Sequence, residues 1–553
     1  MPMIRSGDRR HCRTALLCLA LLLPATASAQ LGDALRLRID SVFADVNRSN
    51  GPGCAVGVAD GDARYLRGYG MSDLQQGTAI AARSIFHVAS VSKQFTAMSV
   101  ALLAEDGKLT LDDDIRSYVP ELPDLGQRIT LRQLMHHTSG IRDQWSLLSL
   151  AGWRFPDDLI SERDVLWVLA RQRGLNFTPG SEYLYSNSGY TLLAVVTQRV
   201  SGMSLRQFAE QRVFAPLGMA DTHFHDDHAM VVPGRTSAYV PRGNEWRVSI
   251  PVFDTYGATS LFTTAGDLLT WMAFLDRVRS EESAWGRVVR AAETSGLLTN
   301  GRAINYGFGL SLGDFRGTRT IGHGGADAGY RAFVERYPDL KGAVAVLCNH
   351  ANANPQGRAE RVARAVFGDR LPPPMVEARA PEHRPSAAVR EAWVGTWRDT
   401  LSNQLVRMWA VGDSIFVDGM RLRFGSDSTG TLPGVPGHLR RTTAGSAVTI
   451  RHVGGGLREP VLVKQPAPFT TFEAYAGRYR SEELDTEYEF IARSGALVRE
   501  HRTLGTQVLR AVARDIFTGG GTTYLIERDR RGRVTGFVVN TGRVRGVRFV
   551  RQR

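Results

Sequence analysis

The sequence predicts an α+β protein, and three observations support that fold class. Alternating apolar patterns typical of strands lie near residues 53–69 and again near residues 330–348. The roughly 250 residues between them carry mainly helical periodicity. Beyond a proline-rich stretch, short alternating segments with frequent glycine predict all-β structure. We therefore expect one domain at residues 30–368 whose sheet is built from both ends of that range, followed by all-β C-terminal domains.

The first 29 residues have the layout of a secretory signal peptide. Arginines precede the apolar run Leu16–Leu23, and the small residues Ala27-Ser28-Ala29 follow it. We expect cleavage between Ala29 and Gln30, and therefore an exported protein that is periplasmic or secreted. The apolar run is too short to span a bilayer, and no run of about 18 apolar residues occurs elsewhere. We expect no integral membrane segment after signal removal.

Composition argues against nucleic-acid binding. The formal net charge is +13, of which +3 comes from the signal peptide, where four arginines outnumber Asp8. The remaining basic residues are spread among acids and form no block interleaved with aromatic residues. The expected partner is a small-molecule or short-peptide substrate, and the sequence does not predict an oligomeric state.

Two cysteines remain after export, Cys54 and Cys348, and both lie in predicted buried strands. A disulfide between them would be allowed in an oxidising compartment. We favour two buried free thiols, since cysteine is common in cores as a small apolar residue.

The elements of the first domain follow from the spacing of its apolar residues. A helix is predicted at the start of the mature chain, with apolar positions at Leu31, Leu35, Ile39, Phe43 and Val46. Two strand pairs are predicted, Gly53–Ala59 with Ala63–Tyr69 and Tyr330–Tyr337 with Ala343–Cys348. A helix over about Arg358–Phe367 closes the domain.

The C-terminal part contains a linker and an internal repeat. Residues 369–386 are rich in proline, which propagates neither a helix nor an interior strand, so they predict a linker. The segment Glu391–Trp397 resembles Glu473–Tyr479, and each copy opens a run of short strands. We expect one small antiparallel β-barrel per copy, at residues 387–468 and 469–553. A single barrel built from both copies is the alternative.

One lysine stands out in a chain that prefers arginine. Only four of its 68 basic residues are lysines, and Lys93 follows Ser90 by three positions. Burial can neutralise an amine, whereas a guanidinium keeps its proton near neutral pH, so this position suits a base. Apolar spacing from Val91 to Leu102 predicts a buried helix with Ser90 in its first turn, where unpaired N–H groups favour negative charge on a serine oxygen. Alone, the pattern also fits an ordinary serine cap.

Tyr185 and Asn187 lie in a loop-like stretch. A phenol beside a lysine can be acidified and shuttle protons, and an asparagine can orient a lysine while donating to a substrate carbonyl. The alternative is a polar turn packed by aromatic residues.

The segment Gly322–Tyr330 is rich in glycine and opens a predicted strand. Glycines would let a substrate backbone approach the strand edge, and the N–H groups of Ala326 and Ser90 could hold an oxyanion. A glycine-rich start of a hairpin with a polar histidine is the alternative.

Together these segments resemble the serine β-lactamase and penicillin-binding-protein superfamily. Ser90-x-x-Lys93 matches its nucleophile motif, and Tyr185-x-Asn187 matches its second motif. His323-Gly324-Gly325 stands where many members have Lys-Thr-Gly, and residues 131–140 resemble a helix and loop of the family. The resemblance covers about residues 31–368. It implies a β-lactamase/transpeptidase-like fold, an antiparallel sheet with helices on both faces and a helical insertion.

The resemblance also implies a serine hydrolase. Ser90 would attack an acyl carbon after losing its proton to Lys93 or to ionised Tyr185, and water would release the acyl group. The implied catalytic residues are Ser90, Lys93 and Tyr185. The implied substrate-binding residues are Asn187, His323, Gly324, Gly325 and Ala326.

Histidine in the third motif bears on the substrate. It is mostly neutral near pH 7 and lacks the permanent cation that lysine offers to the carboxylate of penicillins. Histidine there, with two C-terminal barrels, resembles the D-stereospecific aminopeptidases of the superfamily. We expect hydrolysis of amides or esters, with short D-residue peptides or small esters as candidate substrates. A β-lactamase or DD-peptidase is an alternative, and a non-catalytic scaffold or binding protein is an alternative of another class.

No metal or cofactor is expected. His136 and His137 are adjacent, but neither His-Glu-x-x-His nor paired-cysteine spacing accompanies them. We interpret them as packing residues or as part of a pocket wall.

Overall fold

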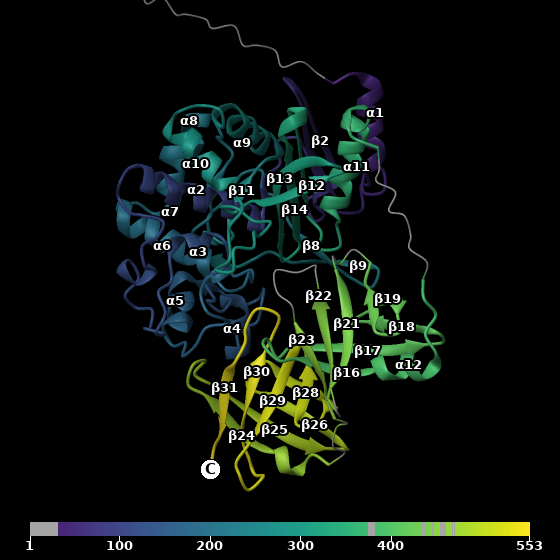
Figure 1. The fold of residues 1–553 in the computed structure, drawn as a ribbon. Coiled ribbons are helices and arrows are strands. Elements are labelled where there is room, and N and C mark those ends of the chain that lie inside the picture. The colour runs from purple at the N-terminus through teal and green to yellow at the C-terminus, as the bar shows by residue number, and fades with distance from the viewer. Residues whose placement is uncertain are drawn as a thin grey trace, which may run out of the picture.

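The computed structural model describes residues 31–553 except for 374–381, 434, 436, 445–446, 454–459, 467 and 469–470. The predicted signal peptide and the centre of the predicted linker lie outside the described residues. An α+β domain is followed by two all-β domains that lie side by side beneath it in Figure 1. Within the described part of the chain, no helix combines the length and apolar character needed to cross a membrane.

A six-stranded antiparallel sheet organises the first domain, in the order β12-β13-β14-β15-β1-β2. Its strands are β1 (Cys54–Asp60), β2 (Ala63–Tyr69), β12 (Ser311–Phe315), β13 (Thr318–Asp327), β14 (Tyr330–Tyr337) and β15 (Gly342–Cys348). β1 pairs with β15 along its whole length, so the two ends of the domain sequence meet in one sheet, as predicted. β15 is fully buried, and β1 is buried from Cys54 to Ala59, which explains their continuous runs of apolar and small residues.

Helices cover both faces of the sheet (Figure 1). α1 (Asp33–Val42) and α11 (Pro355–Phe367) share one hydrophobic core with one face. α9 (Ala265–Val278) lies against β1 and β15 on the other face, within a second core. α11 begins three residues before the predicted position because the Asn354 side chain caps it and proline suits its first turn.

Helices are the main regular elements between the two halves of the sheet, but loops and turns hold more than half of these residues, so the prediction of a mainly helical segment is only partly correct. The remaining helices are α2 (Ser92–Glu105), α3 (Leu131–Met135), α4 (Gln144–Ala151), α5 (Glu162–Ala170), α6 (Asn187–Ser201), α7 (Leu205–Ala209), α8 (Ala215–Leu217) and α10 (Ala284–Ala292). Short strands accompany them, namely β3 (Met71–Asp73), β4 (Thr78–Ala79), β5 (Phe86–His87), β6 (Ile160–Ser161), β7 (His223–Phe224), β8 (Tyr239–Arg242), β9 (Glu245–Val248), β10 (Phe253–Asp254) and β11 (Leu261–Thr263).

Cys54 and Cys348 form a disulfide, so the prediction of two free thiols is wrong. The register of β1 against β15 places the two residues directly opposite each other, with their Cα atoms 4.0 Å apart. A free cysteine and a disulfide both suit a buried position with apolar neighbours, so the local sequence does not distinguish them. The pairing register, which joins residues 294 positions apart, decides between them.

Each C-terminal copy folds into its own closed eight-stranded barrel, which rules out a single shared barrel. The first contains β16 (Gly395–Asp399), β17 (Leu405–Val411), β18 (Ser414–Val417), β19 (Met420–Ser426), β20 (Thr429–Thr431), β21 (His438–Ala444), β22 (Ala447–Val453) and β23 (Val461–Lys464). The second contains β24 (Gly477–Ser481), β25 (Thr486–Arg493), β26 (Ala496–His501), β27 (Gly505–Ala513), β28 (Ile516–Gly519), β29 (Thr522–Arg528), β30 (Val534–Asn540) and β31 (Val547–Arg551).

The sequence echo is a structural repeat at the mouth of each barrel. α12 (Ala387–Trp393) precedes the first barrel, and a single 3₁₀ turn precedes the second. The Trp397 side chain donates a hydrogen bond to the carbonyl of Trp393 (2.9 Å). The Tyr479 hydroxyl donates to the carbonyl of Tyr475 in the same way (2.6 Å). The repeated aromatic pair therefore makes the same hydrogen bond at the same position of both copies.

The second barrel is anchored to the α+β domain by buried polar contacts. Arg142 forms an ion pair with Glu483 (2.6 Å), and both side chains are less than a tenth exposed. The Tyr488 hydroxyl donates to the carbonyl of Leu150, at the end of α4 (2.7 Å). Separating the domains would leave these groups buried without partners or expose them to water, so the second barrel has a defined position on the α+β domain.

The disulfide should stabilise the α+β domain. In the chain-entropy account, a cross-link that closes so long a loop contributes on the order of 5–6 kcal/mol. We expect the double variant Cys54→Ala/Cys348→Ala, and the reduced wild type, to unfold at lower urea concentration than the oxidised protein when tryptophan fluorescence is followed. Equal midpoints for oxidised and reduced protein would contradict this.

Candidate active site

Ser90 lies in η1 (Ala89–Val91), a 3₁₀ turn that leads directly into α2. The sequence prediction placed it in the first α-helical turn. The turn differs because Ala89 adopts a positive φ of 48°, which is rare for a residue with a side chain. Such strain is typical of functional positions. The half-buried Ser90 side chain lines a cavity.

Lys93 is fully buried one turn further along α2. Its Nζ lies 3.0 Å from Ser90 Oγ, 2.9 Å from Asn187 Oδ1 and 2.6 Å from the carbonyl oxygen of Ala258. The last two atoms are acceptors only. An ammonium can donate to all three oxygens, and a neutral amine can donate to the last two and accept from the Ser90 hydroxyl, so the contacts are compatible with both forms.

Burial lowers the pKa of Lys93 well below its ordinary value, because an ammonium in the interior loses its hydration. The negative charge of Asp143 opposes the shift, and the positive charge of Arg543 adds to it. The amine beside Ser90 is therefore suited to accept a proton.

Asn187 begins α6 and links Lys93 to Asp143. Its Nδ2 and its backbone N–H both donate to Asp143 Oδ2, each at 2.8 Å. These bonds fix the amide so that Oδ1 faces Lys93. Asp143 is thus a positioning residue that sequence reasoning missed, although it follows the family-like residues 131–140 closely.

Tyr185 lies with its ring beside Lys93, with Nζ 4.8 Å from the ring centroid. Burial raises the pKa of Tyr185, and the Ser90 hydroxyl offsets only part of that rise. The phenol therefore keeps its proton near neutral pH. Of the two bases that the sequence left open, neutral Lys93 is favoured over ionised Tyr185.

His323, Gly324, Gly325 and Ala326 lie in the last part of β13. β12 pairs with β13 only as far as Gly322, so among the described strands residues 323–327 pair with β14 alone. The segment was predicted to open the following strand. Instead it ends its own strand and presents an open edge beside η1.

Gly325 is required where β13 passes the nucleophile turn. A Cβ atom at this position would lie 2.2 Å from the carbonyl oxygen of Val88, closer than any real contact. The glycine therefore lets the edge of β13 approach Ser90.

His323 is neutral, and both of its ring nitrogens form hydrogen bonds. Nδ1 lies 2.5 Å from the carbonyl oxygen of Gly324, and Nε2 lies 2.9 Å from the Tyr306 hydroxyl. Because a carbonyl only accepts, Nδ1 carries the proton and Nε2 accepts from Tyr306. Burial lowers the pKa of His323 to about 4. His323 therefore lines the cavity without supplying a cation.

His136 and His137 pack behind the site. The His137 ring lies 4.1 Å from the Tyr185 ring, centroid to centroid, and its Nδ1 accepts from the N–H of Ser186. His136 Nδ1 lies 3.2 Å from the carbonyl oxygen of Tyr306. Neither belongs to the group of described residues whose ligand atoms come within 4.8 Å of one another, namely Asp227, His228 and Asp254.

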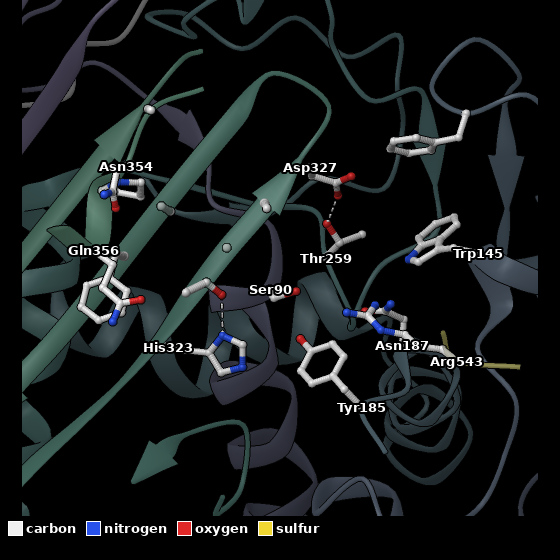
Figure 2. A pocket seen from close by; sticks show the side chains of 18 residues that line it. Ser90, Trp145, Tyr185, Asn187, Thr259, His323, Asp327, Asn354, Gln356 and Arg543 are labelled. Atoms are coloured by element: carbon white, nitrogen blue, oxygen red, sulfur yellow. Dashed lines mark hydrogen bonds between the residues drawn. The ribbon is translucent and has the colours of Figure 1, made fainter. Parts of the chain in front are cut away.

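The cavity in front of Ser90 has a volume of about 670 Å³ (Figure 2). All but one of the predicted site residues line it, and Lys93 lies buried directly behind Ser90. In Figure 2, His323 and Gln356 lie on one side of Ser90, and Trp145, Asn187 and Arg543 lie on the other. Arg543 comes from the second barrel, and nothing in its local sequence pointed to the site.

The α+β domain can now be assigned to a family. The family model described as Beta-lactamase matches residues 39–368. The chain belongs to the β-lactamase family. With the family shown and a buried amine 3.0 Å from the Ser90 hydroxyl, this β-lactamase-family chain is a serine hydrolase.

Relatives with similar sequences extend over both barrels. A D-aminopeptidase of Brucella anthropi is 28% identical over 532 residues, which cover 91% of this chain and 95% of the relative. A D-aminopeptidase of Cereibacter sphaeroides is 27% identical and covers 84% of this chain and 85% of its own length.

Solved structures support the fold. The octameric penicillin-binding protein homologue from Pyrococcus abyssi has a TM-score of 0.53 at 18% identity and covers 84% of this chain and 97% of its own. The D-amino acid amidase from Ochrobactrum anthropi SV3, solved with L-phenylalanine, has a TM-score of 0.51 at 22% identity and covers 61% and 99%.

Lys93→Arg should lose acylation, although arginine can carry the same positive charge as lysine. A guanidinium stays protonated, so Ser90 loses its base, and we expect labelling by a fluorophosphonate to slow on the order of 10²–10⁴-fold. In the wild type, kcat/KM should rise with pH as Lys93 deprotonates and level off above its lowered pKa. Mass spectrometry measures the labelling, with the exposed Lys108→Arg as control. Labelling of Lys93→Arg at the wild-type rate would refute the base.

Asp143→Ala should lower kcat about 10- to 100-fold, because Asn187 then loses the acceptor that orients its amide. Asp143→Asn keeps an acceptor oxygen and should recover part of the rate. It also removes the charge that raises the pKa of Lys93, so the acidic limb of its pH profile should move to lower pH. An unchanged limb and rate in both variants would contradict the positioning role.

Proposed function

We propose that this chain is an exported serine hydrolase that cleaves short D-residue-containing peptides or amides through an acyl-Ser90 intermediate. One observation carries the proposal, namely the buried amine of Lys93, whose Nζ lies 3.0 Å from the oxygen of the Ser90 hydroxyl. Relatives that align over most of this chain and most of their own length, named D-aminopeptidase, support the substrate class.

In the proposed reaction, Lys93 takes the proton of Ser90 as Oγ attacks the acyl carbon. The N–H groups of Ser90 and Ala326 hold the oxyanion. The C–N bond then breaks as the Tyr185 phenol donates a proton to the leaving nitrogen and takes the proton that Lys93 holds, so that Lys93 is neutral again. Water hydrolyses the acyl-enzyme, with Lys93 again as base.

The other hypotheses fit the site less well. A β-lactamase or DD-peptidase that recognised a substrate carboxylate at the third motif would need a cation, and His323 is neutral there. A scaffold would have no use for a buried lysine, whose desolvation is costly. Ester substrates satisfy the same chemistry as amides.

Export is part of the proposal and is supported by two features. The first 29 residues have the layout of a secretory signal. The disulfide between Cys54 and Cys348 suits an oxidising compartment.

The test compares D-alanine and L-alanine p-nitroanilides as substrates of the purified protein. We expect release of p-nitroaniline from the D-enantiomer to exceed that from the L-enantiomer, and Ser90→Ala to abolish it. Rapid turnover of a fluorescent penicillin would favour the lactamase alternative. If wild type and Ser90→Ala were equally inert toward amides, esters and fluorophosphonate, the enzymatic proposal would fail.

A further inference from the structure

A loop of the second barrel reaches the cavity and is held there by the α+β domain. The loop joins β30 to β31 and carries Arg543 and Arg545. The carbonyl oxygen of Arg543 accepts from Asn176 Nδ2 (3.0 Å) and from the N–H of Asp143 (3.3 Å). Arg545 forms an ion pair with Glu182 (3.1 Å). These bonds fix the backbone that places Arg543 beside the active site.

The guanidinium of Arg543 has no carboxylate partner within the described ranges of the chain. Its Cζ lies 4.8 Å from the centroid of the Tyr185 ring, and the side chain is exposed to the cavity. Among the residues that the structure describes, it makes neither an ion pair nor a side-chain hydrogen bond. Stacking on an aromatic ring leaves the N–H edges of a guanidinium free to bind a planar anion.

The other ionisable groups at the cavity either have protein partners or are neutral. Asp327 Oδ2 accepts from Thr259 Oγ1 (2.6 Å) and lies 3.2 Å from His87 Nε2. Lys93 is fully buried and is not part of the cavity lining, and burial lowers the pKa of His323 to about 4, so His323 is neutral. Within the described lining of the cavity, Arg543 is thus the cation that a ligand can reach.

We propose that Arg543 binds a carboxylate of the substrate, so that the preferred substrates are amides of acidic D-residues. This inference rests on the proposed function and names its substrate class. The carboxylate lies at the end of the cavity bounded by Tyr185, Asn187 and Trp145 (Figure 2). A guanidinium binds a carboxylate through two parallel hydrogen bonds, and it repels an ammonium group at the same place. The third motif gives no cation, so the charge that selects the substrate comes from the barrel.

The test uses two substrates of nearly equal size, D-aspartyl and D-asparaginyl p-nitroanilide. For the wild type, kcat/KM should be at least about tenfold higher for the aspartyl substrate. Arg543→Gln should lower kcat/KM for the aspartyl substrate about 10- to 100-fold more than for the asparaginyl substrate. The comparison is made on the pH plateau of each variant, because loss of the Arg543 charge also raises the pKa of Lys93 for both substrates. For Arg543→Lys, kcat/KM for the aspartyl substrate should lie between the values of the wild type and of Arg543→Gln, since lysine keeps the charge but lacks the two parallel N–H donors of arginine. Arg548→Gln, on β31 and outside the cavity lining, is the matched control.

Free D-aspartate gives a readout that does not depend on turnover. It should protect Ser90 of the wild type from fluorophosphonate more strongly than D-asparagine does, and Arg543→Gln should remove the difference. If no D-residue amide is cleaved but this protection is seen, the proposed function fails while the carboxylate site stands. If amides are cleaved, but aspartyl and asparaginyl substrates are equal in wild type and in Arg543→Gln, the inference is overturned.

Discussion

The burial of one amine is the constraint on which the site depends. Lys93 has no contact with water, and an ammonium there would lose its hydration without a directly bonded carboxylate. The neutral form needs two acceptors and one donor, and the protein supplies them as Asn187, the carbonyl of Ala258 and the Ser90 hydroxyl. The same arrangement that satisfies the buried nitrogen also directs its lone pair at the nucleophile. Stability of the interior and reactivity of Ser90 are thus served by one set of contacts.

Each partner of Lys93 is held in turn by a distant segment. Asn187 is oriented by Asp143, whose own N–H donates to the carbonyl of Arg543 in the second barrel. The neighbouring Arg142 is paired with Glu483 of that barrel. The second barrel therefore helps to orient the site. Arg142 docks the barrel, and the adjacent Asp143 orients Asn187. None of the described residues of the first barrel lines the cavity.

The charge pattern of the cavity differs from the one expected when lysine occupies the third motif. Burial and two hydrogen bonds keep His323 neutral, so the open edge of β13 offers backbone groups and the face of a ring. The accessible cation stands instead on the opposite side of Ser90, on a loop from another domain (Figure 2). One catalytic scaffold can in this way be directed to different substrates by moving a single charge.

The sequence by itself determined the fold class, the internal repeat and most of the catalytic group. Helical and strand periodicity is a local property of the sequence. Ser90 and Lys93 are three positions apart, which is about one turn of a helix. This information therefore lies within a few residues. Tertiary structure alone decided the disulfide, the tautomer of His323, the role of Asp143 and the presence of Arg543. Each of these depends on the distance between atoms that are remote in the chain, set by strand register and domain docking. No local pattern encodes those distances, because they result from the packing of the whole molecule.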